Sequence, residues 1–239
     1  PDCSNMCHEA SGYALTSSIG IGKGTVEMDD FNKADAIFVF GQNPGTNHPR
    51  MLATLREARE QGAKVLSFNT LKERGLERFQ DPQHKLEMLT NRSEDISDLY
   101  FRPNIGGDMA LVRGIVKALL ALEDIARENN ETIFDHQFIR QHTSGMDEYL
   151  QQVHATGWPQ ICEQSGLRRD EIEFIARIYA RSEKVICTWA MGVTQHRHSV
   201  ATLHEIVNLL ALRGNIGKPG AGACPVRGHS NVQGDRTMG

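Results

Sequence analysis

The sequence predicts an α/β domain with a mainly parallel sheet, in the three-layer arrangement of Rossmann-like folds. Short apolar runs recur along the chain, and the clearest ones cover residues 35–40, 63–68 and 185–189. The first and the last run are followed by turn residues and then by a segment with helical apolar spacing, and the second by a turn-rich polar stretch. Strands buried on both faces of a parallel sheet read as such continuous apolar runs, because neither face meets water.

The first strand–helix–strand unit begins at Asp35 and ends at Phe68. Asn47 is expected to cap the helix and Pro49 to lie in its first turn, because both residue types favour those positions. One face of this helix is apolar, and Gly62 is expected to end it. With short connections, the unit is a right-handed βαβ crossover.

The middle of the chain alternates polar connections with further elements. A turn-rich polar stretch covers residues 69–94, and residues 99–102 are predicted to form a third strand. Gly106-Gly107-Asp108 opens an apolar-faced helix, and residues 122–168 read as helical surface segments. A further helix is expected to be capped by Asp170.

The last part of the chain contains a fourth strand, residues 185–189, and a long apolar helix that begins after Met191-Gly192 and ends at Gly214. A glycine-rich run then extends to Gly234 and carries Arg227, His229, Asn231 and Gln233. Because glycine allows a close approach of the backbone to a ligand, this run is expected to form a binding wall rather than a linker.

Composition excludes several classes of protein. The chain has 239 residues and a net charge of −4 without any run of Lys or Arg, which argues against nucleic-acid binding. No apolar run approaches the ~20 residues of a membrane span. Five scattered cysteines argue against a disulfide framework and favour a reducing, cytoplasmic location. The chain starts at Pro1 and stops inside the glycine-rich run, so we expect it to be one domain, residues 1–239, excised from a longer polypeptide.

Four loops follow the predicted strands and should gather at one edge of the sheet, where ligands bind in such folds. They are Gly41–His48, Asn69–Gly75, Arg102–Asp108 and Met191–His198. The first is compatible with a phosphate cradle or with tight turns alone, since it matches neither GxGxxG nor a P-loop. Asn69 could read a ribose or a base, or form a simple Asx-turn.

Three residues near the ends of the chain could carry chemistry. Cys7 offers a thiolate, which is a soft metal ligand, but Cys3 and Cys7 alone are weak support for a metal site. His8 could serve such a site or be an ordinary hydrogen-bonded histidine. Arg227 lies between Pro225 and Gly228, a setting that favours anion binding over a surface salt bridge.

Several motifs occur in an order that is typical of one family. They are Met6–His8, Phe38–Pro44, Gly62–Val65, Gly106–Asp108, Met191–Gln195, Gly214–Pro219 and Pro225–Gly234. Over its whole length the chain resembles the large subunit of molybdenum bis(molybdopterin guanine dinucleotide) oxidoreductases, and it is most similar to formate dehydrogenase alpha subunits of the YdeP-type branch.

The resemblance implies roles for particular residues. Cys7 would ligate molybdenum, His8 would accept or relay a proton, and Arg227 would orient the substrate carboxylate. The remaining cofactor contacts would come from four groups: Gly41, Asn43, Thr46 and Asn47 around one guanine dinucleotide; Asn69 at the guanine edge; Gly107 and Asp108 in another cofactor loop; and Met191, Gly192, Gln195, His229 and Gln233 along the pterins. Many relatives have an aspartate in place of Asn69, whose neutral amide offers no charge-assisted bond.

The chemistry implied by the resemblance is the two-electron oxidation of a small anion such as formate. A 4Fe-4S cluster is expected outside this chain, together with an electron-transfer partner, and the fragment alone is expected to be inactive. Two alternatives remain: another molybdopterin reaction such as nitrate reduction, and a non-catalytic nucleotide-binding or redox-partner module.

Overall fold

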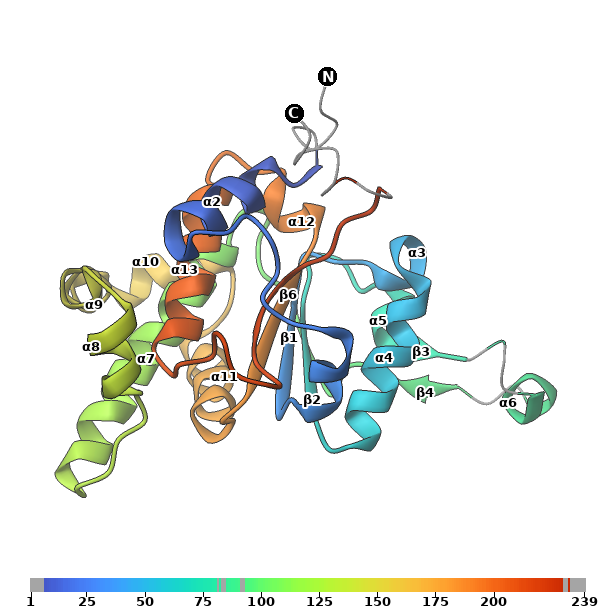
Figure 1. Cartoon of the computed structure of the whole chain (residues 1–239), viewed down its shortest axis with the longest axis horizontal. Helices are drawn as coiled ribbons and strands as arrows, with labels where there is room; N and C mark the ends of the chain where they lie inside the picture. Colours follow the sequence, from blue (N-terminus) through green and yellow to red (C-terminus); the bar gives the residue numbers. More distant parts are fainter. Residues whose placement is uncertain (1–6, 81, 83–84, 91–92, 230–231, 233–239) are drawn as a thin grey trace.

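A parallel sheet of five strands forms the centre of the molecule (Figure 1). The computed structural model describes residues 7–80, 82, 85–90, 93–229 and 232. The strands lie in the order β5-β2-β1-β6-β7, with bounds Leu99–Phe101, Lys64–Phe68, Ala36–Phe40, Val185–Trp189 and Gly222–Pro225. The predicted α/β class with a mainly parallel sheet is confirmed.

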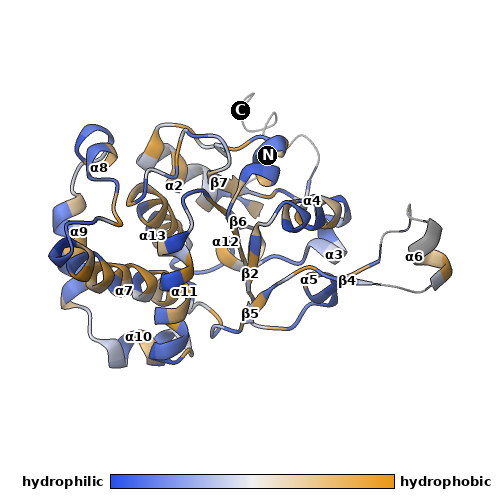
Figure 2. Ribbon diagram, turned by 90° about the horizontal axis from the view of Figure 1, so that it is seen from below, coloured by the Kyte–Doolittle hydropathy of each residue, from blue (hydrophilic) through white to orange (hydrophobic). Residues whose placement is uncertain are grey.

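Helices cover both faces of the sheet (Figure 2). Alternate side chains of a strand point to opposite faces, so Ile37 and Val39 pack under η1 (Met28–Lys33) and α4 (Pro49–Glu60). Phe38 and Phe40 join the larger core on the other face. That core is built with α2 (Glu9–Ile19), α7 (Asp108–Glu128), α11 (Arg169–Arg181) and α13 (Ser199–Ala211). Three layers result, as the sequence predicts.

Shorter elements surround these layers. Three helices flank α7: α8 (His136–His142), α9 (Met146–Ala155) and α10 (Trp158–Ser165). Three four-residue helices follow strands: α3 (Pro44–Asn47), α5 (Arg74–Glu77) and α12 (Met191–Thr194). The polar stretch also contains β3 (Arg78–Phe79) paired with β4 (Glu94–Asp95), and α6 (Lys85–Thr90) between them. Among the described residues, no helix combines the length and apolar character that crossing a membrane requires.

The structure corrects several predicted boundaries. Asn47 is not the cap of α4: it ends α3, and His48 precedes the helix. Asp170 lies in the first turn of α11 and bonds to the Arg168 side chain instead of capping. The long apolar helix ends at Ala211, before Gly214. In each case short-range propensity was right about the region and wrong about the residue, because the approach of neighbouring segments fixes the exact end.

The glycine-rich run, predicted to consist of turns, contains the edge strand β7. It pairs with β6 through Ile186–Gly222 and Trp189–Pro225. A four-residue strand with a glycine and a proline carries almost no strand signal, and an edge position is where a strand tolerates proline. The consequence is functional, because β7 aims the following residues, Val226 to His229, at the same edge as the other strands.

A buried carboxylate fixes the connection between α7 and α8. Glu123 is 1% exposed and accepts hydrogen bonds from the backbone N–H groups of Ile133 (2.7 Å) and Phe134 (3.1 Å). It also accepts from His136 Nε2 at 2.7 Å and Arg127 Nε at 2.9 Å. Burial alone would raise the pKa of Glu123, but these hydrogen bonds outweigh it and lower the pKa to about 2.

Glu123→Gln should therefore destabilise the chain by about 2 kcal/mol at pH 7, since the amide cannot accept all of these bonds. The folded-state pKa lies below the unfolded value of 4.5, so the stabilisation is complete above that pH and is lost as pH falls towards 2. Urea unfolding at a series of pH values measures this. The difference in free energy of unfolding between wild type and variant should narrow as the pH falls from about 5 to 3. A difference that stays constant over this range would contradict the assigned role of Glu123.

Candidate functional site

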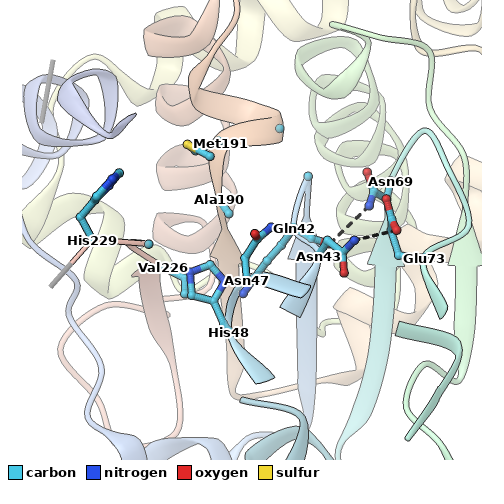
Figure 3. A pocket seen from close by; sticks show the side chains of 13 residues that line it. Gln42, Asn43, Asn47, His48, Asn69, Glu73, Ala190, Met191, Val226 and His229 are labelled. Carbon is cyan, nitrogen blue, oxygen red and sulfur yellow. Dashed lines mark hydrogen bonds between the residues drawn. The ribbon is translucent and has the colours of Figure 1, made fainter. Parts of the chain in front are cut away.

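A polar pocket of about 380 Å³ lies beyond the carboxyl ends of the strands (Figure 3). Its walls come from the segments that follow β1, β2, β6 and β7. The lining residues are Gly41, Gln42, Asn43, Asn47, His48, Asn69, Glu73, Ala190, Met191, Gly192, Val226, Gly228 and His229. The sheet order reverses between β1 and β6, and this reversal is where open α/β sheets leave a crevice for ligands.

Seven of the predicted cofactor residues line this pocket: Gly41, Asn43, Asn47, Asn69, Met191, Gly192 and His229. Thr46 does not, and its backbone N–H donates to Asn43 Oδ1 at 3.2 Å. Gln195 follows α12 and contacts the Met191 sulfur. Gly107 and Asp108 lie at the start of α7, outside the pocket lining. Gln233 falls outside the described residues.

Two glycines let the loops after β1 and β6 cross in contact. The N–H of Gly192 donates to the Gly41 carbonyl at 3.0 Å. A Cβ on Gly192 would lie 2.5 Å from that carbonyl oxygen, and a Cβ on Gly41 would lie 2.7 Å from the Gly192 carbonyl carbon. Gly41 also has φ +52, which side-chain-bearing residues avoid, and its N–H bonds to the Phe68 carbonyl. The Gly41 N–H therefore forms a hydrogen bond inside the protein, while Gly41 itself forms part of the pocket wall.

Gly192→Ala should destabilise the chain by about 1–3 kcal/mol, because backbone must move to admit the methyl group. The matched control is Gly157→Ala, where a Cβ would meet only Pro159 Cδ at an ordinary 3.6 Å. Thermal unfolding of both variants measures the difference. If the two variants have the same Tm, the close crossing of the loops after β1 and β6 does not constrain the fold.

One end of the pocket is a network of amide and carboxylate groups (Figure 3). Asn43 Nδ2 donates to Glu73 Oε2 at 2.7 Å, and Asn69 Nδ2 donates to the Gln42 carbonyl at 3.3 Å. Asn69 Oδ1 accepts from the N–H of Thr70 at 3.1 Å. The Asn69 amide is thus held by protein groups on both sides. Glu73 was not predicted, although it lies in the loop Asn69–Gly75 and is the sole carboxylate among the described residues that line the pocket.

Cys7, His8 and Arg227 lie beside the pocket rather than in its lining. Cys7 is 4% exposed, and its carbonyl accepts a hydrogen bond from Thr194 Oγ1 at 2.7 Å, which ties it to α12. Arg227 Nη2 donates to the Gly22 carbonyl at 3.1 Å. The pKa of His8 is lowered to about 4, mainly by burial and to a lesser extent by the positive charge of Arg227. The two ends of the described chain therefore meet at one place.

A second histidine, His48, has no predicted role yet lines the pocket. Both of its ring nitrogens are buried and meet no hydrogen-bond partner among the described residues. Burial lowers the pKa of His48, and the backbone of Arg227 opposes this shift. Buried polar atoms without partners are rare in folded proteins, and beside a pocket they suit a polar ligand.

An open parallel sheet with a pocket at its reversal point is the arrangement in which α/β proteins bind ligands. The chain belongs to the molybdopterin oxidoreductase family, since the model of that family matches residues 3–237. It is 50% identical to protein YdeP of Escherichia coli over its whole length, and 48% identical to an uncharacterized oxidoreductase of Mycobacterium tuberculosis. The chain covers 32% and 30% of these relatives, about a third of their length.

More distant proteins agree with this assignment. Formate dehydrogenase H of Escherichia coli is 30% identical over 99% of the chain, which covers 29% of that protein. Acetylene hydratase from Pelobacter acetylenicus superposes with a TM-score of 0.68 at 16% identity, covering 90% of this chain and 25% of that one. The latter similarity concerns the fold alone.

The family implies a molybdenum–pterin cofactor, and the residues of the site fit such a group. The pocket offers amide side chains, glycine backbone and the unpartnered His48 ring, which together suit a heterocycle with several donors and acceptors. Among the described residues, no group of three or more His, Cys, Asp or Glu side chains could hold a metal ion. A single thiolate from Cys7 is consistent with a metal whose other ligands belong to the cofactor.

Proposed function

We propose that the full-length protein oxidises a small anion such as formate, with this chain as its central cofactor-binding domain. The observation that carries the proposal is the meeting of Cys7, His8 and Arg227 beside the pocket: a soft ligand, a neutral imidazole and a guanidinium. The 30% sequence identity between this chain and formate dehydrogenase H supports the choice of formate as substrate. When bound, the molybdenum–pterin group would supply two-electron redox chemistry.

Each of the three residues has a distinct task in this proposal. Cys7 ligates the metal through its thiolate. Arg227 holds the substrate carboxylate with two parallel N–H donors, for which its planar guanidinium is suited. His8 handles the proton released on oxidation, and its lowered pKa leaves the ring neutral at pH 7 before the reaction.

The cofactor is proposed to be the bis(guanine dinucleotide) form, held by the pocket residues together with Thr46, Gly107, Asp108, Gln195 and Gln233. A 4Fe-4S cluster and an electron-transfer partner complete the enzyme outside this chain. Glu73 is the group proposed to accept hydrogen bonds from the guanine edge, because its carboxylate is charged and keeps acceptor positions beside the bond from Asn43 Nδ2 to Oε2. A carboxylate accepts from two adjacent N–H donors, which guanine presents and adenine does not.

Glu73→Gln should lower the affinity of the chain for guanosine diphosphate by about tenfold, because a charged acceptor is replaced by an amide. Adenosine diphosphate affinity should change little. Calorimetric titration of both nucleotides measures the preference, with Glu57→Gln on the exposed side of α4 as the matched control. An equal loss of affinity for both nucleotides, or no loss for guanosine diphosphate, would exclude Glu73 as the residue that recognises the guanine base.

The function itself is tested on the full-length protein. Metal analysis should find stoichiometric molybdenum or tungsten, and a redox dye should be reduced in the presence of formate. Dye oxidation with nitrate instead would show another molybdopterin reaction. Absence of both metal and turnover would indicate a non-catalytic module, and would overturn the proposal.

A further inference from the structure

Two buried hydrogen bonds link the indole of Trp189 to the ring of His8. Trp189 Nε1 donates to Ser11 Oγ at 2.9 Å, and Ser11 Oγ lies 2.9 Å from His8 Nδ1. All three residues are fully buried. Trp189 ends β6, whereas Ser11 and His8 belong to the start of α2, so the contact joins the sheet to the segment that carries Cys7.

The direction of the second bond follows from the first. An indole N–H can only donate, so Ser11 Oγ must accept from Trp189. The single hydroxyl hydrogen of Ser11 then needs an acceptor, and His8 Nδ1 is the one within bonding distance among the described residues. If His8 Nδ1 carried a hydrogen instead, the oxygen would receive two donors and its own hydrogen would be left buried without a partner.

We propose that Trp189 and Ser11 hold His8 in the neutral tautomer that carries its hydrogen on Nε2. Leaving a buried hydroxyl hydrogen without an acceptor is costly enough to disfavour the other tautomer by about tenfold or more. His8 Nε2 is buried and has no hydrogen-bond partner among the described residues in either tautomer, so its surroundings do not favour one tautomer over the other. Ser11 and Trp189 are therefore positioning residues for His8.

The consequence for catalysis rests on the proposed function. In this tautomer His8 offers a hydrogen-bond donor at Nε2, and that atom becomes a proton acceptor only after exchange of the tautomer.

Nitrogen NMR of the ¹⁵N-histidine-labelled chain tests the tautomer directly, without cofactor or substrate. His8 is assigned by the signal missing in His8→Gln. We expect Nδ1 to resonate as an unprotonated nitrogen and Nε2 as a protonated one. A protonated Nδ1 would overturn the proposal, and would leave the proposed function standing, because the measurement involves neither metal nor turnover.

Two variants test the cause. Trp189→Phe keeps an aromatic ring but removes the donor, so Ser11 Oγ regains an unpaired acceptor and the tautomer ratio should fall from about ten or more towards one. Trp158→Phe on α10 is the matched control and should leave the His8 signals unchanged. In Ser11→Ala, His8 Nδ1 should shift towards the position of an unprotonated nitrogen without a donor. His8 signals that stay unchanged in Trp189→Phe or Ser11→Ala would contradict the assigned roles.

Discussion

Cys7→Ala should reduce the turnover of the full-length protein to background, because alanine offers no ligand atom to the metal. Pterin content should remain close to wild type, since the proposed grip on the cofactor comes from the pocket residues and not from Cys7. The measurement is dye reduction with formate, together with metal and pterin analysis of the same sample.

Cys162→Ala is the control for this change. Cys162 lies on α10, away from the pocket, and its loss should leave turnover intact. A Cys7→Ala variant that kept a substantial fraction of wild-type turnover would show that the thiolate is not needed at the metal. Loss of the cofactor along with turnover would show instead that Cys7 contributes to retention.

Arg227→Lys should lower kcat/KM for formate by roughly 10–150-fold, while metal content stays normal. Lysine keeps the charge but loses the planar pair of donors that meets a carboxylate with two hydrogen bonds. In the structure one guanidinium nitrogen, Nη2, bonds to the Gly22 carbonyl, which orients the group. Lysine has a single nitrogen, so it cannot keep this contact and also present two parallel donors from separate atoms to a carboxylate.

Arg102→Lys provides the comparison, because Arg102 lies at the same edge of the sheet and donates through Nε to the Thr70 carbonyl at 3.1 Å. Its kinetics should match wild type. Wild-type kinetics of Arg227→Lys towards formate and other small anions would remove Arg227 as the substrate clamp, and with it the main residue-level support for the proposed substrate.

Local sequence was enough to predict the central strands. β1, β2 and β6 are short apolar runs whose side chains are almost all buried, and such runs have few alternatives. β7 was missed because Gly222 and Pro225 dilute its signal, and its pairing with β6 depends on the rest of the fold. Asn47 was misplaced for a local reason, because Asn43 caps a separate short helix, α3, that ends at Asn47.

The site was predictable where it follows from topology. The carboxyl ends of parallel strands share an edge, and this alone brings Gly41, Asn69 and Met191 into one pocket. Glu73 and His48 lie in the same predicted loops, but topology alone does not single them out from their neighbours. Their significance comes from contacts with distant segments, namely the bond of Glu73 to Asn43 and the burial of His48 beside Arg227.

The pairing of β1 with β6 also bears on how the molecule acquires its ligand. Ala36 pairs with Val185 and Phe40 with Trp189, although most of the chain separates these strands in sequence. Closing so long a loop costs entropy before any contact rewards it, so this pairing should be among the slower steps of folding. The crossing of Gly41 and Gly192 exists only after that step. The chain should therefore be unable to capture a nucleotide in this pocket until residues 185–192 have joined the sheet.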